Sequence, residues 1–163
     1  MARRARRAGA AATHSTEEAR WTFACPPASG RYQGIELEGL DPADPDDRRL
    51  LIEAAHPELH GALRRGDAEI VHLGTTMNPR LHITMHEIVA NQLWDDDPPE
   101  TWRTAQRLTA LGYERDDVVH MLASVVAREL WHVLEAGSPS DPARYVAALD
   151  ELPDSWLALA DES

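Results

Sequence analysis

Apolar residues recur at spacings of three and four positions over most of the chain beyond residue 44. This spacing matches the period of the α-helix, and it is interrupted by Asp-Pro, Asn-Pro and glycine positions that are typical of helix ends. An Asp or Asn followed by proline suits a helix start, because the first residue caps the helix and the proline fits its first turn. The pattern predicts helices over residues 45–55, 58–65, 79–94, 100–111, 114–135, 142–149 and 154–160.

The connections between these helices are short, which favours antiparallel neighbours. We therefore expect an all-α fold, an antiparallel helical bundle. Residues 21–45 contain frequent proline and glycine, which predicts an irregular segment with one short extended piece over residues 31–37. Residues 68–77 are expected to form a loop or a short strand. Residues 1–20 are rich in arginine and alanine and lack apolar periodicity, which predicts a disordered tail ahead of a single helical domain over residues 21–163.

Composition is that of one globular domain, with 163 residues, 43% hydrophobic and 27% charged. No apolar run approaches the roughly 20 residues that cross a bilayer, so we expect no membrane association. A single cysteine, Cys25, cannot form an intramolecular disulfide, which is typical of a reducing compartment. These features predict a soluble cytoplasmic protein.

Charge narrows the choice of partners. Acidic residues number 28 against 16 basic ones, all arginine, for a formal net charge of −12 at pH 7. So acidic a chain would repel phosphates, which disfavours general nucleic-acid binding. A protein partner is expected either on the acidic surface, if that partner is basic, or on the arginine-rich tail, if it is acidic.

Two histidines on the predicted helix over residues 79–94 are the most informative feature of the chain. His82 and His86 are four positions apart, and at about 100° per residue they lie within the same stripe as Val89 and Leu93. Imidazoles at this spacing project from one face about one turn apart, which suits two ligands of one metal ion. The alternative is a pair of core histidines that hydrogen-bond to neighbouring helices.

The predicted helix over residues 114–135 offers further ligands. His120 shares a stripe with Asp116, one turn earlier, and small residues follow it on that stripe. If this helix packs on the one that carries His82 and His86, three imidazoles and one carboxylate meet in the bundle core. Such a set suits zinc or iron. Asp116 also has a simpler interpretation, because a carboxylate in the first turn of a helix is favoured by the helix dipole.

Three more residues are candidates for the edge of this site. His56 and His60 are also four positions apart, and they either extend the metal site or cap a helix break; Pro57 between them favours the second interpretation. Gln92 is expected to orient one of the imidazoles through a hydrogen bond.

These motifs resemble a family of small bacterial proteins known as domain-of-unknown-function family 1841. The resemblance covers about residues 47–135 and rests on HPELH at residues 56–60, NPRLHITMHEIVANQL at residues 78–93 and the Asp-Pro-Pro turn at residues 97–99. It ends with the helix of His120, where the family typically has H-x-x-x-H and this chain has Asp116 in the first position. The resemblance implies a histidine site but names no reaction.

Three functions agree with these residues. The first is a helical metal-binding protein of unknown reaction, in which an open coordination position would allow metal-dependent hydrolysis or oxygen chemistry. The second is a non-enzymatic interaction or regulatory module whose histidines form a buried hydrogen-bond network. The third is a pH sensor, because neutral histidines in a core would become charged near about pH 6 and disturb the packing.

Overall fold

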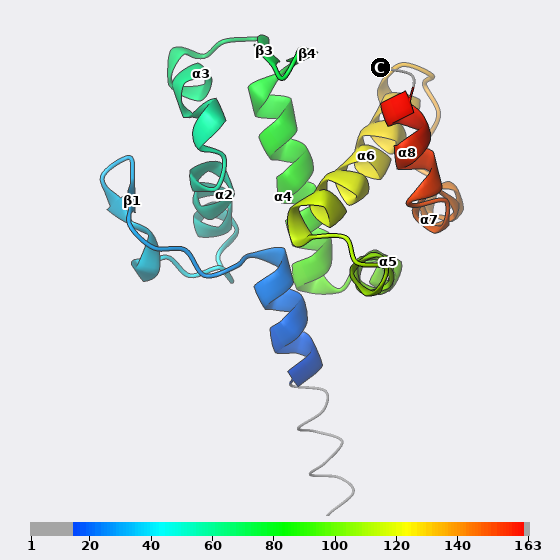
Figure 1. Ribbon diagram of the computed structural model, residues 1–163, viewed down its shortest axis with the longest axis horizontal. Coiled ribbons are helices and arrows are strands. Elements are labelled where there is room, and N and C mark those ends of the chain that lie inside the picture. The colour runs from blue at the N-terminus through cyan, green and yellow to red at the C-terminus, as the bar shows by residue number, and fades with distance from the viewer. Residues whose placement is uncertain (1–14, 162–163) are drawn as a thin grey trace, which may run out of the picture.

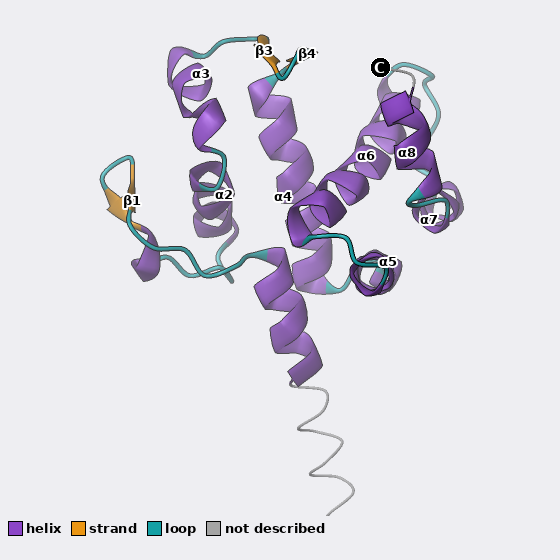
Figure 2. Ribbon diagram, in the orientation of Figure 1, coloured by secondary structure: helices purple, strands orange, loops and turns teal. Residues whose placement is uncertain are grey.

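The computed structural model describes residues 15–161, and these residues form a largely helical fold with two small antiparallel hairpins (Figures 1 and 2). The expectation of a mainly helical chain is confirmed. Residues 1–14 of the expected tail lie outside the described residues. No helix in the described part combines the length and apolarity needed to cross a membrane.

The helices begin and end close to the predicted positions. They are α2 (Pro45–Ala54), α3 (His60–Arg65), α4 (Pro79–Asp95), α5 (Pro99–Ala110), α6 (Arg115–Leu134), α7 (Pro142–Asp150) and α8 (Asp154–Asp161), with 3₁₀ turns η1 (Leu37–Gly39) and η2 (Pro57–Leu59). The side chains of Asp44, Asn78 and Asp141 accept hydrogen bonds from backbone N–H groups of the first turn, as expected for helix caps. Each cap is followed by proline, so local sequence is enough to place these three helix starts.

The N-terminal part differs from the expectation, because residues 15–24 are helical. Arg20 is only 6% exposed, and its Nη1 donates to the carbonyl oxygens of Leu93 at 2.5 Å and Trp94 at 2.6 Å. Trp21 stacks on Trp94 with ring centroids 5.3 Å apart. The last carbonyl groups of a helix lack partners within it, and Arg20 satisfies two of them at the end of α4. This contact between distant segments orders residues that have no apolar periodicity of their own.

Two short hairpins account for the strands. Strands β1 (Arg31–Tyr32) and β2 (Ile35–Glu36) pair in the segment expected to be extended, and β3 (Ile70–His72) pairs with β4 (Thr75–Met77) just before α4. Each hairpin turns through two residues with positive φ, the second of which is glycine. Such turns match the right-handed twist of paired strands.

Helix α4 lies between α2 on one side and α5 and α6 on the other (Figure 1). Its contact with α6 is the most extensive between described elements, which confirms the expectation that these two helices are neighbours. Leu93 of α4, Leu108 of α5 and Leu122 of α6 are all fully buried in the main apolar cluster. Ile83 and Ala90, on another side of α4, pack in a second cluster with residues from α2 and η2. Burial on both sides fixes the orientation of α4 and therefore of its histidines.

Candidate metal centre

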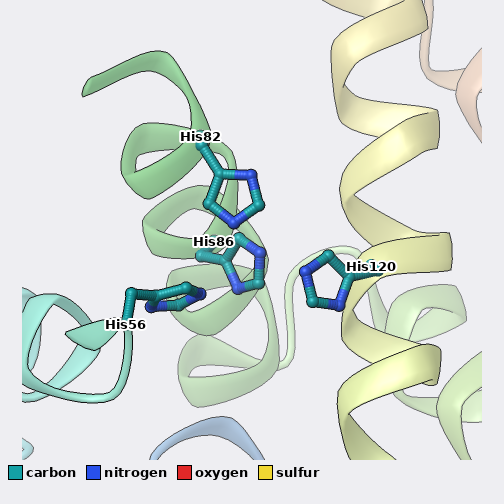
Figure 3. Close-up of side chains that lie close together, drawn as sticks. All are labelled: His56, His82, His86 and His120. Atoms are coloured by element: carbon teal, nitrogen blue, oxygen red, sulfur yellow. The ribbon is translucent and has the colours of Figure 1, made fainter. Parts of the chain in front are cut away.

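Four histidines from three parts of the chain converge between α2, α4 and α6 (Figure 3). Each offers one ring nitrogen, and these nitrogens all lie within 4.8 Å of one another. The four residues are His56, His82, His86 and His120. The structure therefore brings together the three histidines expected from the sequence and adds His56.

His82 and His86 form the α4 side of the cluster. Their ring centroids are 4.5 Å apart, as the spacing of one helical turn predicts. His86 is only 7% exposed, because it lies deeper between the packed helices than His82. The centroid of His86 lies 4.5 Å from that of His56 and 4.7 Å from that of His120, so His86 is in contact with all three other rings.

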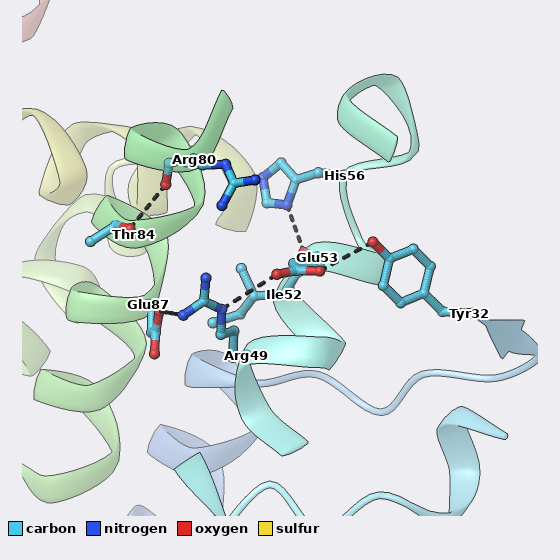
Figure 4. Close-up of polar contacts among 8 residues, drawn as sticks. All are labelled: Tyr32, Arg49, Ile52, Glu53, His56, Arg80, Thr84 and Glu87. Atoms are coloured by element: carbon cyan, nitrogen blue, oxygen red, sulfur yellow. Dashed lines mark hydrogen bonds and ion pairs between the residues drawn. The ribbon is translucent and has the colours of Figure 1, made fainter. Parts of the chain in front are cut away.

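His56 reaches the cluster from the end of α2. Pro57 starts η2 directly after it, and the backbone of His56 is non-helical, with φ −118° and ψ 64°. Its Nδ1 lies 2.7 Å from the carbonyl oxygen of Ile52 (Figure 4). A carbonyl oxygen only accepts, so Nδ1 carries the proton and Nε2 of the neutral ring keeps its lone pair.

His120 on α6 is held in the same way. Its Nδ1 lies 2.7 Å from the carbonyl oxygen of Asp116, four residues earlier on the helix. The proton on Nδ1 again leaves Nε2 of the neutral ring as an acceptor. Metal-binding histidines commonly have this arrangement, in which one ring nitrogen donates to a carbonyl and the other is available to the ion.

The Nε2 atom of His86 is buried and has no hydrogen-bond partner. Among the buried side-chain nitrogens and oxygens of the described residues, only this atom and Nε1 of Trp102 lack one. Leaving such a group unpaired costs about 1–3 kcal/mol, so the atom points to a ligand that the protein itself does not provide.

Burial and the neighbouring rings lower the affinity of the cluster for protons. Desolvation is the main cause that lowers the pKa of His82 to about 4, and the adjacent His56 and His120 lower it further. Desolvation likewise lowers the pKa of His86 to about 2, again with contributions from the other histidines of the cluster. Both rings are therefore neutral at pH 7, the state in which imidazole binds metal ions.

The remaining expected site residues lie elsewhere. The side chain of Asp116 is 85% exposed and pairs with Arg115, so it is the backbone carbonyl of Asp116 that contacts His120 and not the carboxylate. Nε2 of His60 is 2.9 Å from the carbonyl oxygen of Glu53. Oε1 of Gln92 accepts hydrogen bonds from Thr101 and Tyr145, whereas an imidazole of the cluster was expected. Six residues along a helix span about 9 Å, which puts Gln92 too far from His86 for that role.

A largely apolar cavity of about 240 Å³ adjoins the cluster. His56 and His86 line it together with Leu51, Val89 and Cys25. Burial raises the pKa of the Cys25 thiol, so this residue stays protonated and is a poor nucleophile. The cavity gives a small molecule room next to two of the four imidazoles.

The sequence also matches a known family. Residues 40–151 match the family described as Domain of unknown function (DUF1841). The chain belongs to this family. The match confirms the resemblance drawn from the histidine motifs, and all four histidines of the cluster lie within the matched residues of this DUF1841 domain. No curated protein and no solved structure matches the chain.

The sequence predicted His82, His86 and His120 as ligands and named His56 only as a possible extension of the site. Its signal was present in the HPELH segment, since a histidine before proline at a helix break can turn away from the preceding helix. The sequence could not show that this break faces α4. That relation depends on how α2 packs against Ile83 and Ala90.

Proposed function

We propose that this protein binds a divalent metal ion, zinc or iron, through His56, His82, His86 and His120. The observation that carries the proposal is the convergence of four imidazoles around a buried Nε2 atom that has no partner. Imidazole nitrogens are common ligands of both ions.

The geometry of the cluster fits an ion after small side-chain movements. Bonds of about 2.1 Å place neighbouring donors of a tetrahedral ion about 3.4 Å apart. The nitrogens of this cluster lie within 4.8 Å of one another, so small rotations of the side chains would bring them to that spacing. The hydrogen bonds at Nδ1 of His56 and His120 would keep Nε2 directed inward during this movement.

Access to the site favours a chemical role for the ion. The adjoining cavity lets a small molecule approach from the side of His56 and His86. If the ion expands beyond four ligands, so that one position stays open beside the four imidazoles, it would supply Lewis acidity and an activated water. Such an ion would support hydrolysis if it is zinc, and redox chemistry with oxygen if it is iron. The protein residues would bind the ion, exclude bulk water and present apolar walls to the substrate.

The alternative function is a non-enzymatic module whose histidines form a buried hydrogen-bond network. The hydrogen bonds of His56 and His120 to backbone carbonyls agree with such a network, but among the described residues no hydrogen bond joins two of the four imidazoles. The unpartnered Nε2 of His86 favours the metal ion over the network, because a network would satisfy this atom.

Metal analysis of protein purified without an affinity tag tests the proposal. We expect about one equivalent of zinc or iron per chain in the native protein and little in the His86→Ala variant. His132→Ala is the control, because His132 lies on the same helix as His120 but outside the cluster. A native protein that neither contains nor takes up a divalent ion, or a His86→Ala variant that retains it, would contradict the proposal.

A further inference from the structure

Two arginines differ from every other arginine in residues 15–161. The others each donate to an oxygen of the protein, either a carbonyl group or a side chain. Arg64 on α3 and Arg80 on α4 have no such acceptor in this part of the chain. Both residues are exposed, so their guanidinium groups are accessible to a ligand on a protein whose net charge is −12.

Both arginines line the same cavity. It has a volume of about 510 Å³ and lies between α2, α3, α4 and the turn of the first hairpin. Its lining residues are Gln33, Arg49, Glu53, Leu63, Arg64, Arg80 and Ile83. None of the four clustered histidines lines it, so this cavity is distinct from the candidate metal centre.

The one carboxylate of this cavity already has partners within the protein. Glu53 accepts a hydrogen bond from the hydroxyl group of Tyr32 at 3.1 Å and another from Nε of Arg49 at 3.4 Å (Figure 4). Arg49 also approaches Glu87 at 3.9 Å. These contacts leave the guanidinium groups of Arg64 and Arg80 available to a ligand.

The guanidinium group of Arg80 reaches the end of α3. Its Nη2 lies 3.7 Å from the point where a Cβ would stand at Gly66, the residue that ends α3. Arg64 lies in the last turn of the same helix, and both arginines line the cavity. Three arginines and one glutamate give the lining a formal charge of +3 − 1 = +2, opposite in sign to the whole chain.

We propose that this cavity binds a small molecule that carries a phosphate group. A phosphate monoester has a charge of about −1.5 to −2 at pH 7, which matches the charge of the lining. Guanidinium groups bind phosphate oxygens with paired, charge-assisted hydrogen bonds. The volume is in the range of small-molecule sites and leaves room for an organic group beside the phosphate, against Leu63 and Ile83.

Calorimetric titration of the full chain with inorganic phosphate, at constant ionic strength set with sodium chloride, tests this proposal. We expect saturable binding to the native protein and at least tenfold weaker binding to the Arg64→Gln, Arg80→Gln double variant. Arg103→Gln, Arg128→Gln is the matched control, because it removes the same charge from exposed arginines on α5 and α6. This control should bind phosphate as the native protein does.

A second comparison separates the site from the histidine cluster. The titration is repeated after dialysis against a chelator, and phosphate binding should persist because it does not depend on a metal ion. Circular dichroism checks that both double variants are folded. No saturable binding to the native protein, an equal loss in the two double variants, or binding that disappears with the chelator would each overturn the proposal.

Discussion

The ring centroids of His86 on α4 and His120 on α6 lie 4.7 Å apart, with the rings nearly perpendicular. No hydrogen bond joins them, although Nε2 of His86 is buried and unpartnered. The contact between α4 and α6 therefore brings two polar rings together without satisfying the deeper one. A divalent ion between the rings would give Nε2 of His86 the partner that the protein does not provide.

The identity of the fourth ligand is testable by paired substitutions. We expect His56→Ala to weaken metal binding at least about tenfold, because it removes one donor from the cluster. Asp116→Asn should leave metal affinity unchanged, because the carboxylate is exposed and only the backbone carbonyl contacts His120. Competition with a chromophoric chelator measures both affinities. A loss of affinity in the Asp116 variant, with His56→Ala unaffected, would reverse the assignment.

Metal-free protein should become more stable when His86 is made apolar. His86→Leu removes the unpartnered Nε2 atom from the interior, and relief of this cost is expected to raise the free energy of unfolding by about 1 kcal/mol. Urea denaturation in the presence of a chelator measures the effect. In the presence of metal the order should invert, because the ion stabilises only a folded state that can bind it. A destabilised variant under both conditions would contradict this prediction.

The stability of the metal-free protein should fall with pH below neutrality. The pKa of His82 is about 4 and that of His86 about 2 in the folded state, against about 6.5 in an unfolded chain. Between these values the unfolded state binds more protons, so the free energy of unfolding decreases as the pH falls from about 7 to 4. Near pH 6 both rings are still neutral in the folded protein, so this loss of stability comes from protonation of the unfolded chain and not from charging of the folded core.

Urea denaturation at pH 7.5 and pH 5 measures this dependence. The loss of stability between the two values should be clearly smaller in a His82→Leu, His86→Leu variant, because two of the groups that protonate on unfolding are gone. His132→Ala removes a histidine outside the cluster and should lose as much stability between the two pH values as the native protein does. Identical losses in all three proteins would show that the cluster does not control acid stability.

The N-terminal helix should contribute to stability through Arg20. Arg20→Ala leaves the carbonyl oxygens of Leu93 and Trp94 without their donor, and we expect it to destabilise the protein by about 2–3 kcal/mol. Arg31→Ala is the control, because the ion pair of Arg31 with Glu36 is exposed and should contribute less than about 1 kcal/mol. Thermal denaturation compares the two variants. Equal midpoints would mean that the hydrogen bonds of Arg20 to the end of α4 add no stability.

Much of the fold could be read from local sequence. Helix caps followed by proline, glycines after the last apolar positions, and the three- and four-residue spacing predicted α2 and α4 to α8 within about two residues at each end. The spacing of His82 and His86 also placed both rings on one face of α4. These features depend on hydrogen bonds and side-chain directions within one or two turns, which the sequence alone determines.

The tertiary structure decided the rest of the candidate site. His56 joins the cluster and the carboxylate of Asp116 does not, because the packing of α2 and α6 against α4 sets which side of each segment faces the others. Arg20 orders residues 15–24 through carbonyl groups at the far end of α4. Contacts between residues so far apart leave no periodic pattern in the sequence. They depend on how whole helices pack against one another and not on the spacing of residues along one helix.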